Sequence, residues 1–451
     1  MDGLSSLRRR DPARPGGRLG RAHSRRVVGL GTATLAAMAM GCGFTSAASA
    51  AGRAAAAPVT WSRAAEIRLP ANAGADPDAS LYGVTCTSGG TCLAGGGYQD
   101  TSANDQSMVV AEAHGRWARA RELRLPSDAT AQPYSEVNSV ACTSARSCVA
   151  VGYYQFSTLE DHGFIATESG SRWARARAPL LPRNADTSLG SALQAVACPG
   201  PGSCVAIGSY TDKAHHFEPM DVTQVRGRWT RATELTLPAN AAANPDTFLV
   251  GLACPRRGYC VATGSYNVSS GADQGLGLTE SQGRWRRGTE IKAPSNANGQ
   301  DANVDSVSCV TAGSCVAIGH YQIGPSQYGA IAVTESNGRW GRPRLIADLP
   351  PGAAKGSSPA VDGLACSAGT PCVAIGGYGP PGGNFLAMAT SPARGGWQDA
   401  TRIRLPANAG AGALRKAFLY SVACWAVGRC FAVGYYQDRS AHLVPMAAAY
   451  R

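Results

Sequence analysis

Seven tryptophans recur along this 451-residue chain at intervals of 55 to 57 residues. They are Trp61, Trp117, Trp173, Trp229, Trp285, Trp340 and Trp397. Paired cysteines follow the same interval, and each pair has the form Cys-x5-Cys. A fixed period near 50 residues is typical of stacked repeats such as β-propellers, in which every repeat supplies one structural unit. We therefore expect one repeat array rather than several unrelated domains.

Each repeat contains four short runs with the composition of β-strands. In the second repeat these runs span residues 137–142, 148–154, 163–168 and 172–178. Asn337-Gly338, between the third and fourth runs of another repeat, suits a tight hairpin turn. Proline, as in Leu125-Pro126, follows the fourth run and ends it, because proline cannot donate to a strand ladder. We predict an all-β fold: a seven-bladed β-propeller with four antiparallel strands per blade.

The two ends of the chain predict how the ring closes. The last repeat stops after its third run and lacks the tryptophan strand, whereas residues 57–70 contain a tryptophan strand with no blade before it. We expect residues 59–69 to supply the fourth strand of the seventh blade. Closure of this kind removes the exposed strand edges that an open sheet presents.

The cysteine pairs admit three interpretations: metal binding, redox chemistry or disulfide bonds. Zinc needs four ligands near one point, and no other His or Cys recurs beside the pairs. Paired cysteines at constant spacing in an exported chain favour disulfides, each closing a short hairpin. The expected pairs are Cys86–Cys92, Cys142–Cys148, Cys198–Cys204, Cys254–Cys260, Cys309–Cys315, Cys366–Cys372 and Cys424–Cys430.

Residues 1–50 have the pattern of an export signal: a basic stretch, an apolar run of 14 residues and then small residues. Ala48-Ser49-Ala50 is a candidate cleavage site, and Arg25-Arg26 loosely matches a twin-arginine signal. Cys42 is a candidate for lipidation, the alternative being cleavage near Ala50. We expect a linker over residues 51–58 and the propeller over 59–451, without a membrane-spanning segment. The mature protein is expected to be secreted or held at the cell surface.

Charge argues against nucleic acid as a partner. The chain has a net charge of +12, but residues 1–50 contribute eight Arg and two Asp, or +6, which leaves +6 for the remaining 401 residues. That excess is spread as single arginines, and no basic stripe interleaved with aromatic residues occurs. Glycans and extracellular proteins remain the candidate partners.

Two further residue types recur once per repeat. The tryptophans are either sugar-stacking platforms or wedges between blades, and the packing role is favoured. Glutamates end the third run of four repeats (Glu112, Glu168, Glu280 and Glu335). Paired carboxylates are typical of glycosidases, but one carboxylate per blade favours an ion pair with the arginine of the following turn.

Ligand sites on repeat scaffolds commonly lie where the repeat varies. The loops after the second run vary in length and composition, and we expect them to share one face with the Leu-Pro connections, opposite the cysteine hairpins. Their candidate ligand residues are Asp100, Asp161, His162, Asp212, His215, His216, Tyr328, Asp438 and Arg439. Asp212 with His215-His216 is the most metal-like group, although adjacent histidines in polar loops usually face solvent. We expect no cofactor and no metal, since no known phosphate-loop, calcium-loop or hydrolase motif is present.

The phrase V-x-C-x5-C-V-A-x-G, exemplified by VACTSARSCVAVGYY at residues 140–154, resembles a repeat of secreted actinobacterial β-propeller proteins. That group is described as sialidase-like or galactose-oxidase-like. The resemblance covers roughly residues 59–451 and implies a propeller fold. The S-x-D-x-G-x-x-W box of sialidases is absent, and neither an arginine triad nor a set of copper ligands can be matched. The resemblance therefore implies no catalytic residue.

Two functional hypotheses follow from the sequence. The first is a non-catalytic binding or scaffold propeller that presents variable loops on one face to a glycan or a protein. The second is a glycan-active hydrolase or lyase with its site in the central funnel. Carboxylates that converge in the funnel mouth would weaken the first hypothesis, because glycoside hydrolysis needs two carboxyl groups about 5–10 Å apart.

Overall fold

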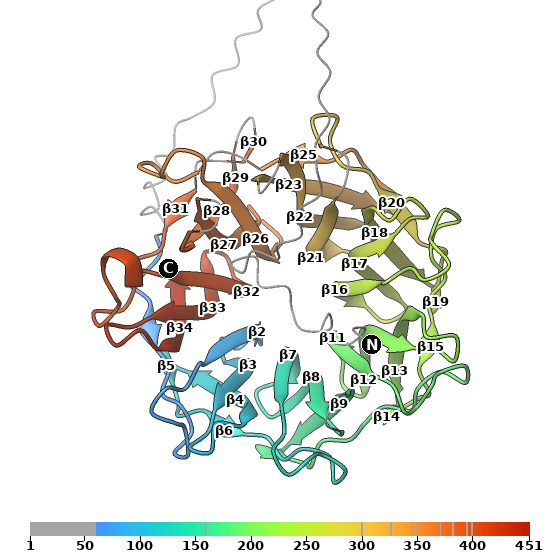
Figure 1. Cartoon of the computed structure of the whole chain (residues 1–451), viewed down its shortest axis with the longest axis horizontal. Helices are drawn as coiled ribbons and strands as arrows, with labels where there is room; N and C mark the ends of the chain where they lie inside the picture. The colour runs from blue at the N-terminus through green and yellow to red at the C-terminus, as the bar shows by residue number, and fades with distance from the viewer. Residues whose placement is uncertain are drawn as a thin grey trace, which may run out of the picture.

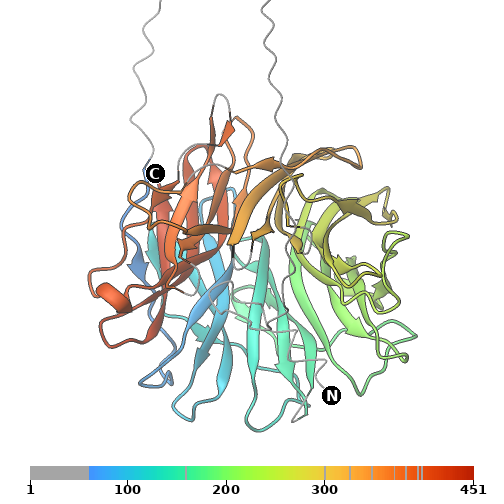
Figure 2. The ribbon, with the colours of Figure 1, turned by 45° about the horizontal axis from the view of Figure 1, so that its top comes forward.

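A computed structural model describes residues 60–157, 160–298, 301–324, 327–346, 349–369, 371–380, 383–393, 396–397 and 400–451. Seven antiparallel sheets stand around a central axis like the blades of a propeller (Figure 1). The tilted view in Figure 2 shows long inner strands running between the two faces of the ring. The fold class predicted from the sequence is confirmed.

Blades are numbered here in chain order. The first, innermost strands are β2 (Ser80–Cys86), β7 (Ser135–Ser144), β11 (Ser191–Gly200), β16 (Phe248–Arg256), β21 (Ala302–Thr311), β26 (Ser358–Ala365) and β32 (Ala417–Ala426). The second strands are β3 (Cys92–Gln99), β8 (Ser147–Gln155), β12 (Ser203–Thr211), β17 (Tyr259–Asn267), β22 (Ser314–Gly324), β27 (Val373–Gly379) and β33 (Arg429–Gln437). The third strands are β4 (Asp105–Ala113), β9 (Asp161–Ser169), β13 (Phe217–Val225), β18 (Asp273–Ser281), β23 (Gln327–Ser336), β28 (Leu386–Thr390) and β34 (Leu443–Tyr450).

The outer edge of a blade is made of short pieces rather than the continuous fourth strand that the sequence predicts. In blade 1, β5 (Arg116–Trp117) and β6 (Arg121–Glu122) both pair with β4. The other outer pieces are β10 (Arg172–Trp173), β14 (Arg228–Trp229), β15 (Thr233–Glu234), β19 (Arg284–Trp285), β20 (Thr289–Ile291), β24 (Arg339–Trp340), β25 (Arg344–Leu345), β29 (Pro392–Ala393), β30 (Gly396–Trp397) and β31 (Thr401–Arg402). One short 3-10 helix, η1 (Gly412–Leu414), precedes β32.

The N-terminal strand closes the ring as predicted. Strand β1 (Ala65–Glu66) pairs antiparallel with β34, the last strand of blade 7, and Trp61 forms a further bridge with Tyr450. In Figure 1 the blue start of the described chain lies against the red final blade. The N-terminal segment therefore covers the outer edge of β34 at these positions.

Hydrophobic residues fill the spaces between neighbouring blades. All seven repeated tryptophans are partly buried against these clusters. Trp117 of blade 1, for instance, meets Phe431 of blade 7 edge to face, with 5.4 Å between ring centroids. Packing, rather than stacking on a ligand, accounts for this repeated residue.

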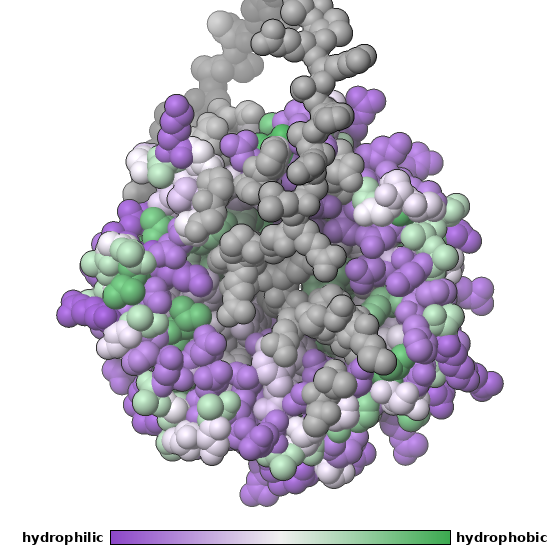
Figure 3. All heavy atoms as spheres, in the orientation of Figure 1, coloured by the Kyte–Doolittle hydropathy of each residue, from purple (hydrophilic) through white to green (hydrophobic). Residues whose placement is uncertain are grey.

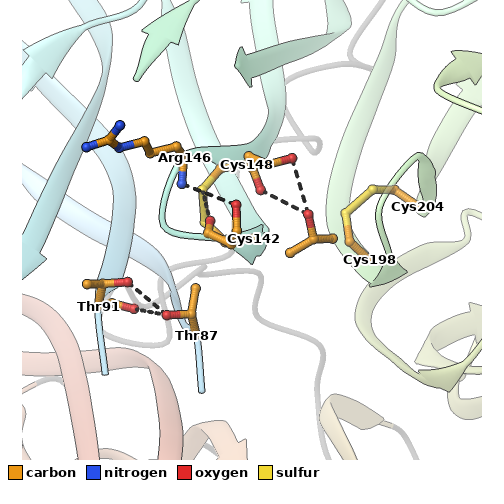
Figure 4. Close-up of a disulfide and its surroundings, with 10 residues drawn as sticks. Thr87, Thr91, Cys142, Arg146, Cys148, Cys198 and Cys204 are labelled. Carbon is orange, nitrogen blue, oxygen red and sulfur yellow. Dashed lines mark hydrogen bonds between the residues drawn. A yellow bond between two sulfur atoms is a disulfide. The ribbon is translucent and has the colours of Figure 1, made fainter. Parts of the chain in front are cut away.

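A disulfide joins the two cysteines of every pair, across the hairpin between the first and second strands. The Cα atoms of each pair are 4.0 to 4.2 Å apart. Figure 4 shows Cys142–Cys148 and Cys198–Cys204 in adjacent blades. Multiple disulfides fit a location outside the cytoplasm. Within the described residues no helix is long and apolar enough to cross a membrane.

A repeated hydrogen-bond network explains the Leu-Pro-x-Asn-Ala connection. The Tyr98 hydroxyl of blade 1 donates to Asn72 Oδ1 and Glu122 Oε2, and Asn72 Nδ2 donates to the same carboxylate at 2.8 Å. Blade 7 has the same network, with Glu66 of β1 in the place of Glu122. The N-terminal segment therefore occupies the position that its repeat assigns to it.

The glutamates at the end of the third strand do not pair with the arginine of the next turn as expected. Glu112 lies opposite Trp117, whereas Arg116 lies opposite Ala113 and so projects from the other face of the sheet. Glu112 Oε1 instead accepts a hydrogen bond from the Gly115 backbone N–H at 2.5 Å. Its role is to hold the turn.

Candidate functional site

Every first strand carries a β-bulge at the same position. In blade 1 the bulged residue is Tyr82, which lies between Leu81 and Gly83 and has no partner on β3. Bulges turn a side chain away from the regular alternation of a strand and are frequent beside functional sites. The seven bulged residues, called the bulge ring below, all line the central channel: Tyr82, Asn138, Gln194, Val250, Asp305, Asp362 and Tyr420.

The glycine of the V-A-x-G motif permits the bulge. A Cβ built on Gly152 would lie 1.8 Å from the carbonyl oxygen of Glu136, two residues before the bulge of that blade. The equivalent glycines of the other six blades would meet the corresponding oxygen at 1.9 to 2.0 Å. Only glycine allows the second strand to come so close to the first.

The channel has a volume of about 1700 Å³. Blades 5 and 6 contribute Asp305 and Asp362 to the bulge ring, and blades 7 and 1 contribute Tyr420 and Tyr82. Blades 2 and 3 contribute two amides, whereas blade 4 contributes Val250. The bulge ring thus has an acidic side, an aromatic side and an amide side.

His320 lies beside the acidic side of the bulge ring. Its Nδ1 is 2.7 Å from Asp305 Oδ2, and its Nε2 is 3.4 Å from Asn303 Nδ2. Burial alone would lower the pKa of this imidazole. The neighbouring carboxylates of Asp305, Asp362 and Asp301 outweigh burial and raise the pKa of His320 to about 9. The imidazole is therefore protonated at neutral pH.

Aromatic rings are in contact along the adjacent side, in blades 7 and 1. Tyr420 is 5.0 Å from both Tyr82 and Phe418, and 5.9 Å from Tyr435, between ring centroids. The ammonium group of Lys416 lies over the Tyr435 ring at 5.5 Å. Lys416 is not itself a channel-lining residue.

Glu136 connects the aromatic side to blade 2. Its carboxylate accepts hydrogen bonds from the Tyr153 hydroxyl at 2.8 Å and the Tyr82 hydroxyl at 3.2 Å. Tyr153 also stacks on Tyr134. Burial and the charge of Glu136 raise the pKa of Tyr153 well above its ordinary value, so the phenol remains a donor. These contacts fix the orientation of the Tyr82 ring in the channel wall.

Gln194 is a polar side chain of the bulge ring for which neither amide atom has a hydrogen-bond partner among the described residues. It is 2% exposed, and neither Nε2 nor Oε1 has a partner. An unsatisfied buried amide costs about 1–3 kcal/mol, so its retention calls for an explanation such as a ligand. Gln194 can donate and accept at once, as a hydroxyl-bearing ligand requires.

The mouth of the channel on the loop face is acidic. Eight carboxylates, called the mouth carboxylates below, line it: Asp78, Asp105, Glu136, Asp246, Asp273, Asp301, Asp305 and Asp362. Among the described residues that line the channel there is no Arg and no Lys. The cysteine hairpins line the opposite end.

Most of the loop residues that the sequence predicts to contact a ligand lie outside this channel. Of the nine, only Tyr328 lines it, where its ring meets His320 edge to face at 5.7 Å between centroids. The loops do share a face with the Leu-Pro connections, as Ala73–Asp100 and Ala409–Asp438 bridges show. Hydrophilic residues dominate the rim visible in Figure 3.

Three of the loop aspartates have the same structural role. Asp212 Oδ1 accepts the backbone N–H groups of Ala214 and His216, both at 2.8 Å. Asp100 and Asp438 accept equivalent N–H groups in their own loops. These aspartates cap tight turns.

The other loop residues also have local roles. His162 stacks on Phe156 with 3.6 Å between ring centroids, and burial lowers its pKa. Asp161 is buried and opens strand β9. His215 occupies a left-handed turn position with φ 65°, and Arg439 donates to the Ala407 carbonyl.

Asp212, His216 and Glu218 form a group whose ligand atoms lie within 4.8 Å of one another. Burial, with the charges of Glu234 and Asp212, raises the pKa of Glu218 to about 7. In blade 7 the Nδ1 atom of His442 lies 3.6 Å from Asp438 Oδ2 in the same kind of turn, although Val444 stands there in the place of Glu218. The capped turn accounts for the Asp–His proximity.

Sequence reasoning missed the bulge ring, although the sequence contains a signal for it. The position four residues before the first cysteine changes chemical type from blade to blade, while the residues around it are nearly constant. Variation was expected in the loops and not within the first strand. The remaining residues of the mouth, such as His320, follow no repeat pattern.

Comparison with protein-family models finds no match, and no curated protein matches in sequence. Solved structures do resemble this chain. An ulvan lyase, from a new family of polysaccharide lyases, is 9% identical, with 83% of this chain and 94% of that chain covered and a TM-score of 0.50. A protein of unknown function from Dyadobacter fermentans DSM 18053 is 9% identical, with coverage of 87% and 99% and a TM-score of 0.48. A Hadza microbial sialidase is 10% identical, with coverage of 76% and 73% and a TM-score of 0.45.

Identities this low show a shared fold and nothing more. The class of protein that the fold and the site define is a disulfide-linked seven-bladed β-propeller with an acidic, aromatic central channel. The propeller fold implied by the repeat motif is supported by the resemblance to the ulvan lyase.

Proposed function

We propose that this protein binds a carbohydrate in the mouth of its central channel. The observation that carries the proposal is Gln194, a channel-lining residue whose buried amide has no hydrogen-bond partner for either polar atom among the described residues. A sugar hydroxyl both donates and accepts and therefore suits such an amide.

The rest of the mouth supports the same ligand class. Small-molecule sites are typically concave and lined by aromatic rings, with a few polar groups that set the orientation of the ligand. Tyr82 and Tyr420 supply ring faces, and Asp305 and Asp362 supply hydrogen-bond acceptors at the same level of the channel. The shared fold of a polysaccharide lyase is consistent with the proposal.

The site differs from the one predicted from the sequence. The loops remain part of the same face, but their aspartates and histidines are engaged in turns. The proposal therefore places the ligand at the bulge ring rather than on the loops.

Hydrolysis is a second candidate function, favoured by one observation. Asp305 and Asp362 occupy equivalent positions on adjacent blades, and both act on the pKa of His320. A glycosidase needs one carboxyl group that is protonated and one that is ionised. Asp305 and Asp362 are therefore the two carboxylates to test for hydrolysis.

The binding proposal is tested with the purified, disulfide-intact protein on a glycan array, followed by calorimetric titration of the best ligand. We expect Gln194→Ala and Tyr420→Ala each to weaken binding by about tenfold, because each removes a central contact. His215→Ala, in the peripheral loop, is the matched control and should leave affinity unchanged. An unchanged affinity in Gln194→Ala together with a loss in His215→Ala contradicts the proposal.

Release of reducing ends separates the two candidate functions. Release of sugar by the wild type that is lost in Asp362→Asn supports hydrolysis, whereas binding without release supports a binding protein.

The mass of the intact exported protein tests the proposed location outside the cytoplasm. Cleavage near Ala50 leaves fourteen cysteines, and a lipid on Cys42, which lies outside the described residues, adds an acyl mass.

A further inference from the structure

We propose that the loop of blade 3 binds a divalent transition-metal ion of the zinc type through Asp212, His216 and Glu218. The loop joins β12 to β13 in the ring (Figure 1). One oxygen of each carboxylate and one imidazole nitrogen lie within 4.8 Å of one another. None of these three residues lines the central channel, so the metal site is separate from the proposed carbohydrate site.

Two of the three ligands are brought together by the turn itself. Asp212 Oδ1 accepts the backbone N–H of His216 at 2.8 Å, and Asp212 Oδ2 lies 3.8 Å from His216 Nδ1. Blade 7 forms the same turn, with Asp438 and His442 3.6 Å apart at the same atoms. The turn therefore explains the Asp–His pair, whereas the third ligand needs an explanation of its own.

Glu218 is the residue that sets blade 3 apart. The position opposite the repeated tyrosine of the second strand holds Glu218 in blade 3, Gln106 in blade 1 and Val444 in blade 7. In blade 1, Gln106 donates to Asp100 Oδ2 at 3.0 Å, and the Asn104 amide donates to the same oxygen at 3.2 Å. Blade 1 thus satisfies its aspartate with two neutral donors. Blade 3 replaces both amides with metal-binding groups, a carboxylate and an imidazole.

The replacement puts like charges side by side. The charges that act on Glu218 are those of Glu234 and Asp212, and both are negative. Glu234 is held in place by the Tyr210 hydroxyl at 2.7 Å and by Asn184 Nδ2 at 2.8 Å. Like charges repel more strongly where they are partly buried, as Glu218 is. A divalent cation between Asp212 and Glu218 would replace this repulsion by attraction to both carboxylates.

The ligand set favours zinc over calcium and magnesium. Calcium and magnesium take oxygen ligands, whereas an imidazole nitrogen together with carboxylate oxygens suits zinc and its neighbours in the transition series. Ligand atoms around one zinc ion lie roughly 3–4 Å apart, so small side-chain rotations bring the three groups into range. Three protein ligands leave one position for water, and the His216 side chain, which is 33% exposed, leaves the site accessible to solvent.

The proposed ligands differ from the group identified in the sequence, Asp212 with His215-His216. His215 occupies a left-handed turn position and is not among the three residues whose ligand atoms come together. Glu218, at the start of β13, takes its place. Adjacent histidines in the sequence therefore do not act as a pair here.

The test is calorimetric titration of zinc chloride into the exported, disulfide-intact protein, made without a histidine tag and freed of metal by a chelator. At pH 7.0 we expect one equivalent to bind. The melting temperature should rise with zinc, because a ligand that binds only the folded protein stabilises it. Glu218→Gln and His216→Ala should each weaken zinc binding about 100-fold, since each removes a ligand.

Matched variants locate the ion. Glu218→Gln installs the residue that blade 1 has at this position and should therefore fold like the wild type. His442→Ala is the control, because blade 7 has the same Asp–His turn with Val444 in the place of the third ligand. It should leave the zinc affinity unchanged, as should His215→Ala. Circular dichroism spectra that match the wild type show that each variant is folded.

Three results would overturn the inference. The first is a wild type that takes up no zinc, and the second is equal zinc affinity in the wild type and Glu218→Gln. The third is binding of calcium in preference to zinc that persists in His216→Ala, which would show a site made by carboxylates alone. Because the three ligands lie outside the channel, none of these results changes the carbohydrate proposal.

Discussion

At the scale of single residues, the glycine of each repeat acts through the residue that it faces on the paired strand. The glycine of V-A-x-G has no side chain to contribute, yet it allows the bulge that turns the preceding strand's side chain into the channel. The motif residues thus make the site possible, and the variable bulge ring gives it its chemistry.

Gly152→Ala should lower the free energy of unfolding by about 2–4 kcal/mol, because its Cβ would meet the carbonyl oxygen of Glu136 and force the two strands apart. Urea denaturation followed by fluorescence measures the change. Gly89→Ala is the matched control, since the nearest atom to its Cβ is the Thr87 hydroxyl at 3.9 Å. Equal stability of the two variants would refute the explanation of the bulge.

His320 should make the stability of the protein depend on pH. Its pKa is raised from 6.5 to about 9, so its pairing with Asp305 stabilises the fold fully below pH 6.5 and is lost as the pH rises through 9. The contribution is about 2–3 kcal/mol. Urea denaturation at pH 6.0, 7.5 and 9.5 should show the difference between the wild type and His320→Asn shrinking with pH. His114→Asn, at an exposed turn, is the control, and a pH-independent difference for His320→Asn would contradict the prediction.

At the scale of elements, the first hairpin of each blade combines a disulfide at one end with a bulge near the other. The two devices act on different properties. The disulfide ties the ends of a short loop, whereas the bulge sets the direction of one side chain. Stability and ligand contact are therefore separable within one hairpin.

Replacing Cys142 and Cys148 together by serine should lower the free energy of unfolding by about 2 kcal/mol, the loop-closure entropy of a short crosslink. Glycan affinity should stay unchanged, because this hairpin lies at the far end of the channel. Ala145→Ser, exposed in the same hairpin, is the control for the substitution itself. Loss of affinity with stability preserved would show that the cysteine end takes part in binding.

At the scale of the whole molecule, closure of the ring depends on contacts between the two ends of the chain. Ile67 is buried in the cluster between blades 7 and 1, and Glu66 completes the hydrogen-bond network of blade 7. The channel exists only when the seven first strands are held around one axis. A ligand site formed by all blades therefore requires an intact ring.

A chain beginning at residue 70, which lacks β1, should melt about 5–10 °C below a chain beginning at residue 60, because buried apolar contacts are lost and the β34 edge is left unpaired. Differential scanning calorimetry of the two chains measures the shift. The shorter chain should also bind glycan less tightly. Identical melting temperatures would refute the closing role of β1.

The sequence by itself determined the repeat, the number of blades, the cysteine pairs and the strand that closes the ring. These follow from local rules: strand periodicity, proline and hairpin turns act within one repeat, and a period of about 56 residues copies the result seven times. The loop residues Asp100, Asp212 and Asp438 also follow a local rule, that of turn capping, and their role as ligand residues stays a prediction.

Only the tertiary structure decided where the site lies. Tyr82, Asp305, Asp362 and Tyr420 are separated by as many as 338 residues in sequence and meet because closure brings every first strand to the same axis. Their direction depends on a bulge, which strict alternation along a strand does not predict. The free amide of Gln194 and the protonated state of His320 depend likewise on neighbours from other strands. Chemistry that arises from non-local contacts could be read only from the folded ring.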